Sequence, residues 1–507
     1  MNHRTETLKT IPEPKSFPAA LFSALVGVAM FAGACVVGPK YQKPSAPVPA
    51  AYKEAQVMTD QEGNAWKEAQ PSEAAKKGKW WEIYNDPELN ALEEQVSISN
   101  QNIKVAEAQF REAKDAVRIA RSGLFPTVSS SPSIVNSGSS RELGNGGGAN
   151  ISSGSHTTYT LPVDLSYVVD LWGNIHRSVA ASAALAQLSD ATLENARLSF
   201  QAELAVDYFQ LRGTDGDKDL LEHTVKSYEE YLTLTQNRYA GGIASGGDVA
   251  QAETQVETAR AQLIDLETSR AQFEHAIAVL IGKPPAALSV TEGGIKAPPP
   301  PIPVGVPSTL LERRPDIAGA ERSMAAANEQ IGIAQSAYYP TLTLSASAGL
   351  ESTQFLKWFS WPARFWSVGP QLAETLFDAG RRHAQTDQAR AAFDASVASY
   401  RQTVLTGFQQ VEDNLSALRV LDNEAKAEDN AVKAAERSLQ ISTDQYKAGT
   451  VSYLQVITTQ AIALQDERTA VDILTRRLVA SVLLVEALGG GWDSTKLPAT
   501  QDLVNGK

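Results

Sequence analysis

The stretch RYAGGIASGGDV, residues 238–249, follows one long helical pattern and precedes another. A second stretch, QYKAGTVSYLQV at residues 445–456, carries tyrosine, glycine, serine and valine at the same spacing, so that Tyr446 corresponds to Tyr239. Glycine adopts the backbone angles that tight turns require, so each stretch predicts a turn between two helices. We infer that the chain contains one helical hairpin unit twice.

The repetition extends outward from the two turns. NQNIKVAEAQF, which leads to LFP at Pro126, matches RRPDIAGAERS, which leads to YYP at Pro340. The two halves also end alike, with VLIG at Gly282 and EALGG at Gly489. The chain is therefore predicted to contain an internal two-fold sequence repeat, that is, two copies of one unit.

Within each repeat, the spacing of the apolar residues changes from a helical to a strand pattern. Apolar residues from Leu89 to Leu124 follow the 3-4 spacing of a coiled-coil seam. TYTLPVDLSYVVD and TLTLSASAGL then alternate between apolar and polar residues, which predicts strands with one apolar face. A soluble sandwich and a membrane sheet both produce this alternation. The pattern predicts a mixed α and β fold with two strands per repeat.

The longest helical segments exceed the thickness of a bilayer. Helical sequence continues from Gly173 to Gly241 and again from Gly380 to Gly449. Each such helix would be about 100 Å long. The flanking helices, at roughly 87–124 and 249–281, are about half as long. Short helices stacked end to end are therefore expected beside unbroken long ones.

Two local irregularities are expected. Gly213 and Gly216 predict a kink in the first long helix. The last strands of the two repeats, aligned on Asp170 and Asp378, alternate out of phase, which predicts a bulge in one of them.

Hydrogen-bond accounting limits how this chain could enter a membrane. Charged residues interrupt every long helical stretch, so a membrane segment would have to be formed by strands. Four strands per chain cannot close a barrel by themselves, because bacterial membrane barrels begin at eight strands. Open edges are not tolerated in lipid, so several chains would share one barrel, and three chains would supply twelve strands.

The N-terminus suggests export. Basic residues precede an apolar run that ends near Phe31 and is too short to span a bilayer, which is typical of a signal peptide. Ala32 and Ala34 satisfy the ordinary cleavage rule, whereas the same run also resembles a lipobox, with Cys35 as the acylated residue. A buried cysteine in a cytosolic protein is the alternative. Cys35 is the only cysteine, so no intramolecular disulfide is possible.

Composition excludes several classes of function. The formal net charge is −13, which disfavours nucleic acid as a partner. The six histidines are scattered, and the chain has no HExxH motif, P-loop or GxSxG elbow. We therefore expect neither an enzyme nor a bound metal or cofactor.

Several further motifs resemble the outer-membrane factor (TolC-type) family, and more narrowly its NodT-type lipoproteins. They include CVVGPKYQKP, KWWEIYNDPELNALEEQV, YVVDLWGNI, VPSTLLERRPDIAGAE, LFDAGRR and FQQVEDNLSALRVL. The resemblance implies a homotrimer with a twelve-stranded barrel in the outer membrane, continued by a long coiled-coil α-helical barrel through the periplasm. It also implies lipid attachment at Cys35. The implied partners are a periplasmic adaptor protein and an inner-membrane RND transporter.

An acidic pair lies within FQQVEDNLSAL. Asp413 lies two positions from both Val411 and Leu415, so it points away from their apolar seam. From periodicity alone, a solvated outer face is the favoured explanation of this placement. The resemblance implies instead that Asp413, with Glu412 beside it, belongs to a periplasmic gate in which three carboxylates surround one axis. The duplicate unit is expected to have Leu204 and Ala205 at these places.

The two glycine turns have two interpretations. As tight turns they need no further explanation. The resemblance implies that they dock the adaptor protein, through Gly241, Gly242, Ser245, Gly449, Thr450 and Ser452.

The resemblance implies an outer-membrane exit channel of a tripartite efflux pump. It would conduct drugs or other toxic small molecules passively out of the cell. A type I protein secretion channel of the same fold and a periplasmic coiled-coil scaffold without a pore are the alternatives. The predicted organisation is a signal peptide (1–34), a lipidated extended segment (35–86), the first repeat (87–283), a Pro-rich linker (284–311), the second repeat (312–491) and a tail (492–507).

Overall fold

A computed structural model describes residues 36–54, 78–138, 155–302, 304 and 307–505. The predicted signal peptide and Cys35 lie outside the described residues. The chain forms two compact units. The described residues of the sheet unit are 36–40, 119–138, 155–180 and 328–390, and those of the helical unit are 41–54, 78–118, 181–302, 304, 307–327 and 391–505.

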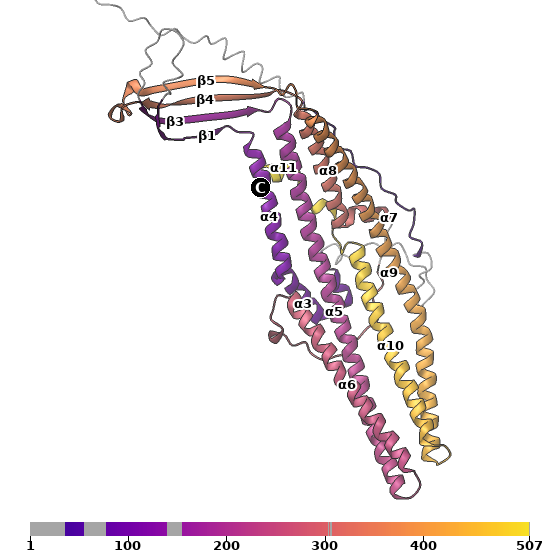
Figure 1. The fold of residues 1–507 in the computed structure, drawn as a ribbon. Coiled ribbons are helices and arrows are strands. Elements are labelled where there is room, and N and C mark those ends of the chain that lie inside the picture. Colours follow the sequence, from indigo (N-terminus) through magenta and orange to yellow (C-terminus); the bar gives the residue numbers. More distant parts are fainter. Residues whose placement is uncertain (1–35, 55–77, 139–154, 303, 305–306, 506–507) are drawn as a thin grey trace, which may run out of the picture. The chain divides into compact units, whose positions relative to one another are not determined.

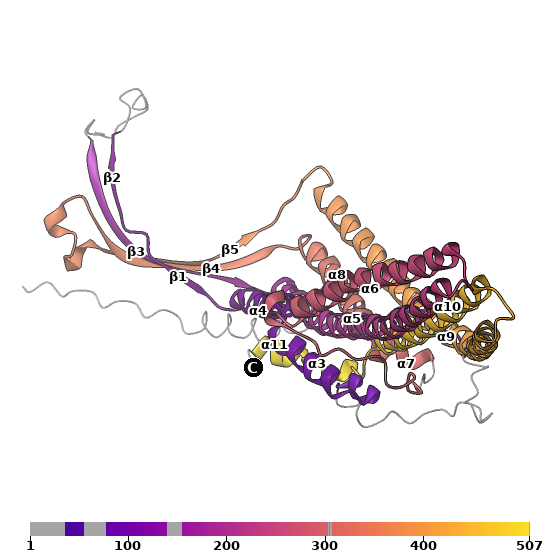
Figure 2. The ribbon, with the colours of Figure 1, turned by 90° about the horizontal axis from the view of Figure 1, so that it is seen from below.

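The sheet unit contains one antiparallel sheet (Figures 1 and 2). Its order is β1-β3-β4-β5, and β2 also pairs with β3. The strands are β1 (Thr127–Ser129), β2 (Ser133–Ser137), β3 (His156–Val169), β4 (Thr341–Ser352) and β5 (Arg364–Ala373). Both edges, formed by β1 with β2 and by β5, pair on one side only among the described residues.

The first strand of repeat one is interrupted. β1 and β2 share one register on β3, because Thr127 lies opposite Ser166 and Ser133 lies opposite Thr160 without any residue being inserted. The break falls just before and at Pro132, which has no backbone N–H for a ladder hydrogen bond. Each repeat therefore contributes two strand paths, as the alternation predicts.

The predicted bulge is wrong. β3 and β4 keep one register from the pair Tyr159–Ser352 to the pair Val169–Leu342, and β4 and β5 are paired equally regularly. In β5 both faces are largely exposed within a single chain. Apolar residues on this strand therefore do not mark one buried face, and the phase of the two strands is no guide to a bulge.

The two repeats have helices of equal length. The long helices α5 (Asn174–Ala240) and α9 (Arg381–Lys447) have 67 residues each, and the return helices α6 (Gly246–Leu280) and α10 (Tyr453–Ala487) have 35 residues each. All four appear as long rods in Figure 1. The starts and ends of α9 and α10 follow those of α5 and α6 at one constant spacing, so the duplication predicted from sequence is present in the fold.

The first long helix is not interrupted at the predicted kink, because α5 continues through Gly213 and Gly216 as one helix. A Cβ atom at Gly213 would overlap the side chain of Thr475 on α10. Gly213 therefore allows two helices to approach closely, and the neighbouring helix compensates for its low helix propensity.

The flanking helices are broken once in each repeat. Asn100 separates α3 (Pro87–Ser99) from α4 (Gln101–Ser122), and Arg314 separates α7 (Pro307–Arg313) from α8 (Pro315–Ser336). α3 begins at a proline, and the Asp86 carboxylate caps it by accepting hydrogen bonds from two backbone N–H groups. The remaining helical segments are η3 (Trp80–Tyr84), η5 (Pro285–Ala287), η6 (Phe355–Lys357), η7 (Trp361–Ala363), η8 (Ser494–Lys496) and α11 (Thr500–Asn505).

The main hydrophobic core lies in the helical unit and joins both repeats. It includes Trp80, Leu204, Tyr208, Ile317, Val404, Val411, Leu415 and Val482. None of the helices that the structure describes combines the length and apolarity needed to cross a membrane.

Candidate functional site

The two acidic residues on α9 have different surroundings. Val411 and Leu415 are completely buried, whereas Asp413 is exposed. The Asp413 side chain accepts one hydrogen bond, at 3.3 Å, from the amide of Gln409 one turn earlier. Asp413 therefore points away from the apolar seam, as its spacing predicts, and its carboxylate is available in a single chain.

Glu412 is already engaged within the chain. One carboxylate oxygen accepts the backbone N–H of Lys53 at 2.8 Å, and the other accepts that of Glu54 at 3.0 Å. These two residues belong to the segment 41–54, which we call the strap. The structure thus separates the predicted acidic pair into an exposed carboxylate and one that holds the strap.

The long helices also show which residues are equivalent in the two repeats. Because α5 begins at Asn174 and α9, of the same length, begins at Arg381, the counterparts of Glu412 and Asp413 are Ala205 and Val206. The counterparts expected from sequence, Leu204 and Ala205, were one residue out of register. Neither counterpart is acidic, so the pair belongs to the second repeat only.

The first hairpin turn is exposed. Gly241, Gly242 and Ser245 are not buried, and Gly242 has a φ of 77° with open space where a side chain would begin. The Ser245 hydroxyl accepts the Asp248 N–H, and the Asp248 carboxylate accepts the Ser245 N–H. This capping box fixes where α6 begins.

The second turn is built similarly and contacts the first. Gly449 has a φ of 76°, and the Thr450 N–H donates to the Gln445 carbonyl at 3.0 Å. Thr450 and Ser452 lie at the surface. Arg238, at the end of α5, donates to the Tyr446 carbonyl at 2.7 Å and lies 4.5 Å from the Tyr446 ring centroid. The structure thus brings the two predicted turn regions together.

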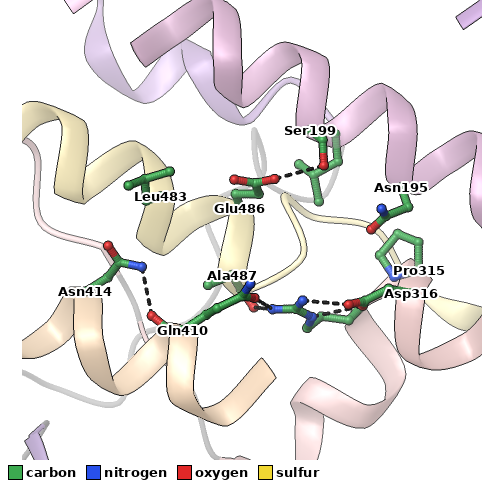
Figure 3. A pocket seen from close by; sticks show the side chains of 11 residues that line it. Asn195, Ser199, Pro315, Asp316, Gln410, Asn414, Leu483, Glu486 and Ala487 are labelled. Carbon is green, nitrogen blue, oxygen red and sulfur yellow. Dashed lines mark hydrogen bonds and ion pairs between the residues drawn. The ribbon is translucent and has the colours of Figure 1, made fainter. Parts of the chain in front are cut away.

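The ERRPDI stretch forms a pocket that the sequence analysis did not anticipate (Figure 3). Arg314 is buried, and its guanidinium makes a two-point ion pair with Asp316 at 2.9 and 2.6 Å. It also donates to the side chain of Gln410 on α9 at 2.7 Å and to the carbonyl of Ala487 on α10 at 3.1 Å. One arginine therefore joins the α7–α8 break to two further helices.

The pocket beside Arg314 has a volume of about 370 Å³ and is lined by α5, α8, α9 and α10. Glu486 and Ser199 lie on its wall, where the serine hydroxyl donates to the carboxylate at 2.9 Å (Figure 3). Burial raises the pKa of Glu486, which the serine hydrogen bond partly opposes. Arg314 bonds to Asp316 and Gln410, and Ser199 bonds to Glu486, as expected of a structural joint.

The first repeat has an equivalent joint. Asn100 donates to the carbonyl of Leu280, the last residue of α6, at 2.8 Å, as Arg314 does to the last residue of α10. A Cβ atom at Gly282 would overlap the Ser99 carbonyl, and one at Gly489 would overlap the Arg313 carbonyl. The glycines that end both repeats therefore allow the return helix to meet the break in the flanking helix.

Sequence reasoning missed both joints, although the signal for a break differs between the two repeats. Pro315, directly after Arg314, is the usable signal in the second repeat, because the residue before proline disfavours the helical conformation. In the first repeat Asn100 gives only the preference of asparagine for a helix cap.

Comparison with known proteins identifies the family to which this fold belongs. The profile described as "Outer membrane efflux protein" matches residues 92–283 and 306–490. The probable efflux pump outer membrane protein TtgC of Pseudomonas putida is 32% identical over 477 residues, covering 92% of this chain and 95% of the relative. The pyoverdine export outer membrane protein OpmQ of Pseudomonas aeruginosa is 31% identical over 430 residues, covering 84% and 90% respectively.

Solved structures agree. The outer-membrane channel OprN superposes with a TM-score of 0.81 at 28% identity, over 90% of this chain and all of that one. The CmeC outer membrane channel of Campylobacter jejuni gives a TM-score of 0.84 over 93% and 98%, and at 20% identity it supports the fold alone. A small antiparallel sheet joined to paired long helices is thus the fold of TolC-type channel subunits. The chain belongs to the outer membrane efflux protein family.

Proposed function

We propose that this chain is the outer-membrane exit channel of a tripartite efflux pump and conducts small molecules passively. The observation that carries the proposal is the family match over both repeats, together with relatives named as efflux pump outer membrane proteins. A conduit lowers no chemical barrier, so it needs no catalytic group. The partners would be a periplasmic adaptor and an inner-membrane RND transporter.

The open edges of the sheet support a homotrimer. Both edge paths pair on one side only among the described residues, and unpaired backbone groups are costly in lipid. Val128, Ile134, Trp366 and Val368 are exposed on these edge strands in the single chain, which suits contact with lipid or a neighbouring copy. Three copies joined edge to edge would form a twelve-stranded barrel in the outer membrane, continued by an α-helical barrel in the periplasm.

Asp413 would form the gate of this channel. Its exposed carboxylate lies on a long helix, and three copies around one axis would attract cations and narrow the passage. Glu412 was expected to share this role, but its carboxylate oxygens hold the strap. The two hairpin turns, which present exposed glycines, would receive the adaptor, and Cys35 would carry the lipid anchor.

Single-channel recording in a planar bilayer tests the pore and the gate together. We expect a small, mostly closed current from the wild type and a larger one from Asp413→Ala, because alanine removes the side chain that narrows the passage and the carboxylate that could hold it closed through hydrogen bonds. Asp429→Asn, which neutralises another exposed carboxylate on α9, is the matched control and should behave like the wild type.

The other outcomes separate the alternatives. Equal currents from wild type and Asp413→Ala would keep the channel and remove Asp413 as its gate. Absence of current from both folded proteins would favour the periplasmic scaffold. Export of a folding-deficient protein substrate, with no change in drug resistance on deletion, would favour the type I secretion channel.

A further inference from the structure

The loop that joins β4 to β5 carries an exposed apolar surface (Figure 1). It includes η6 and η7, and in this loop Leu356 is 96% exposed, Trp361 75% and Phe359 69%. Because α8 precedes the start of β4 and α9 follows the end of β5, the loop lies at the other end of this hairpin. The corresponding loop of the first repeat, residues 138–155, contains no aromatic residue. The apolar loop therefore belongs to the second repeat alone.

The strand register gives the sheet one apolar face next to this loop. Alternate residues of a strand share a face, and so do residues directly opposite each other on neighbouring strands. On β4 the face consists of Leu342, Leu344, Ala346, Ala348 and Leu350. Their partners on β5 are Leu372, Pro370, Val368, Trp366 and Arg364. Arg364 is thus the one charged residue on this face of β4 and β5, and it lies at the loop end.

The loop packs onto the same apolar face. Tyr159 shares this face, because it lies two residues before Leu161, which is opposite Leu350. The Tyr159 ring lies 5.6 Å from the ring of Trp358 and 5.5 Å from that of Phe355. Trp358 is buried, and its indole N–H donates to the Leu350 carbonyl at 3.3 Å. A buried tryptophan therefore fixes the loop to the apolar side of the sheet.

The rim of the apolar face is positively charged. The Arg364 guanidinium lies 3.9 Å from the centroid of the Trp361 ring, and Arg364 and Lys357 are both exposed. Residues 352–373 contain no aspartate or glutamate. The acid that precedes them, Glu351, lies on the opposite face of β4, because it alternates with Leu350. Two cations without an acid therefore accompany the exposed aromatic rings.

The lengths of the strands suit a membrane surface at this rim. β4 has 12 residues and β5 has 10, and a tilted strand crosses the hydrocarbon of a bilayer with about 9–11 residues. In the proposed barrel the hairpin therefore ends where the lipid head groups begin. Aromatic rings favour this depth, and anionic head groups attract lysine and arginine there. Trp366 and Val368, each 67% exposed, extend the apolar face toward the hydrocarbon.

We propose that the β4–β5 loop binds an anionic, phosphate-bearing lipid of the outer leaflet, with Lys357 and Arg364 holding the phosphate groups and the exposed apolar side chains of the loop entering the hydrocarbon. The two cations make a lipid a better occupant than a neighbouring copy, whose loop would bring the same two positive charges. This inference rests on the proposed barrel, which brings the loop to the membrane surface, and deepens it by assigning a lipid partner.

Lipid binding by the full-length protein in a neutral detergent tests the proposal. The probe is fluorescent lipid A, compared with the same lipid after removal of its phosphate groups, and fluorescence anisotropy measures the affinity. The wild type should bind lipid A about tenfold more tightly than the dephosphorylated form, and added salt should weaken this preference. Lys357→Gln with Arg364→Gln should lose about tenfold in affinity for lipid A, together with the salt dependence, and should bind the dephosphorylated form like the wild type.

Two further variants separate charge from apolar contact. Lys433→Gln with Arg437→Gln is the matched control, because it removes the same charge from exposed positions on α9 and should bind both lipids like the wild type. Leu356→Ser should weaken the binding of both lipids alike, by about threefold to tenfold, because it removes apolar contact alone. All these positions are exposed, and circular dichroism verifies that each variant is folded.

Three results would overturn the lipid proposal. They are equal affinity of the wild type for the two lipids, equal affinity of the Lys357 and Arg364 double variant and its matched control for lipid A, and disulfide-linked dimers of Leu356→Cys above the background of the unaltered chain. The last result would make a neighbouring copy the occupant.

Conductance of the same preparation in a planar bilayer separates this proposal from the proposed channel. A conducting protein that does not distinguish the two lipids would lose the lipid proposal and keep the channel. A protein that prefers lipid A through Lys357 and Arg364 but never conducts ions would keep the lipid proposal and lose the channel.

Discussion

At the scale of single residues, Glu93 on α3 is unusual. It is fully buried, and neither carboxyl oxygen has a hydrogen-bond partner among the described residues. Burial raises its pKa well above the ordinary value of 4.5. The native protein therefore keeps a proton that the unfolded chain releases, so the contribution of Glu93 to stability is greatest below the unfolded pKa and is lost as the pH rises above it.

Replacing Glu93 by Gln should consequently stabilise the protein at pH 7, by about 1–3 kcal/mol, because an amide avoids the cost of protonating a carboxylate at neutral pH before it is buried. The gain should shrink as the pH falls below the ordinary pKa of a glutamate. Thermal unfolding of the detergent-solubilised protein, followed by circular dichroism from pH 4 to pH 8, measures it. A variant that is less stable than the wild type at every pH would show that Glu93 has a partner in the assembled protein.

Two glycines of the helical unit predict opposite effects of an alanine substitution on stability. Gly489 has a φ of 91°, and a Cβ atom there would overlap a backbone carbonyl, so Gly489→Ala should lower stability by about 2 kcal/mol or more. Gly216 lies inside α5, and a Cβ atom there would be 3.4 Å from Val471, so Gly216→Ala should raise stability by about 0.5–1 kcal/mol. Apparent melting temperatures of the two variants should move in opposite directions.

At the scale of elements, the helices could be predicted with few errors, because their apolar period persists over dozens of residues. The boundaries at Gly241 and Gly449 were placed within two residues of the helix ends at Ala240 and Lys447. The errors arose where tertiary contacts decide. The bulge was inferred from the phase of an apolar alternation, and in the single β5 strand this alternation does not mark a buried face. Gly213 gave no sign in the sequence that Thr475 packs against it.

The candidate site, too, could be predicted only where local geometry decides. Helical periodicity was sufficient to place Asp413 on the exposed face of α9, because only local geometry was involved. The contacts of Glu412 could not be predicted, because its partners, Lys53 and Glu54, lie 359 and 358 residues earlier in the chain. No local pattern reports a contact at that separation.

The hairpin turns give a prediction about docking. A side chain at Gly242 would meet no neighbour within 4 Å but would adopt a left-handed backbone angle, so Gly242→Trp should fold, at a cost of about 1–2 kcal/mol, and should project a bulky ring outward. We expect loss of drug resistance in cells with trimers still present on gels. Gly247→Trp, beyond the turn and without a positive φ, is the control for bulk alone. Loss of trimers in Gly242→Trp would favour a purely structural turn.

At the scale of the whole molecule, the proposed lipid anchor is Cys35, which lies outside the described residues. If Cys35 is acylated, radiolabelled palmitate should enter the wild type and not Cys35→Ser, and the variant should still be exported because the signal peptide is unchanged. Membrane fractionation of both proteins completes the measurement. Label in neither protein would leave the ordinary signal-peptide cleavage as the better account of the N-terminus.

The equal lengths of the paired helices restrict how this molecule can change in size. Arg238 and Tyr446 meet because α5 and α9 each have 67 residues before their turns. Removing seven residues from α9 alone would shorten that arm by about 10 Å, and the two turns would no longer be level. Lengthening or trimming is therefore tolerable only when both halves change by the same number of turns. The two turns thus act as a length gauge that ties one repeat to the other.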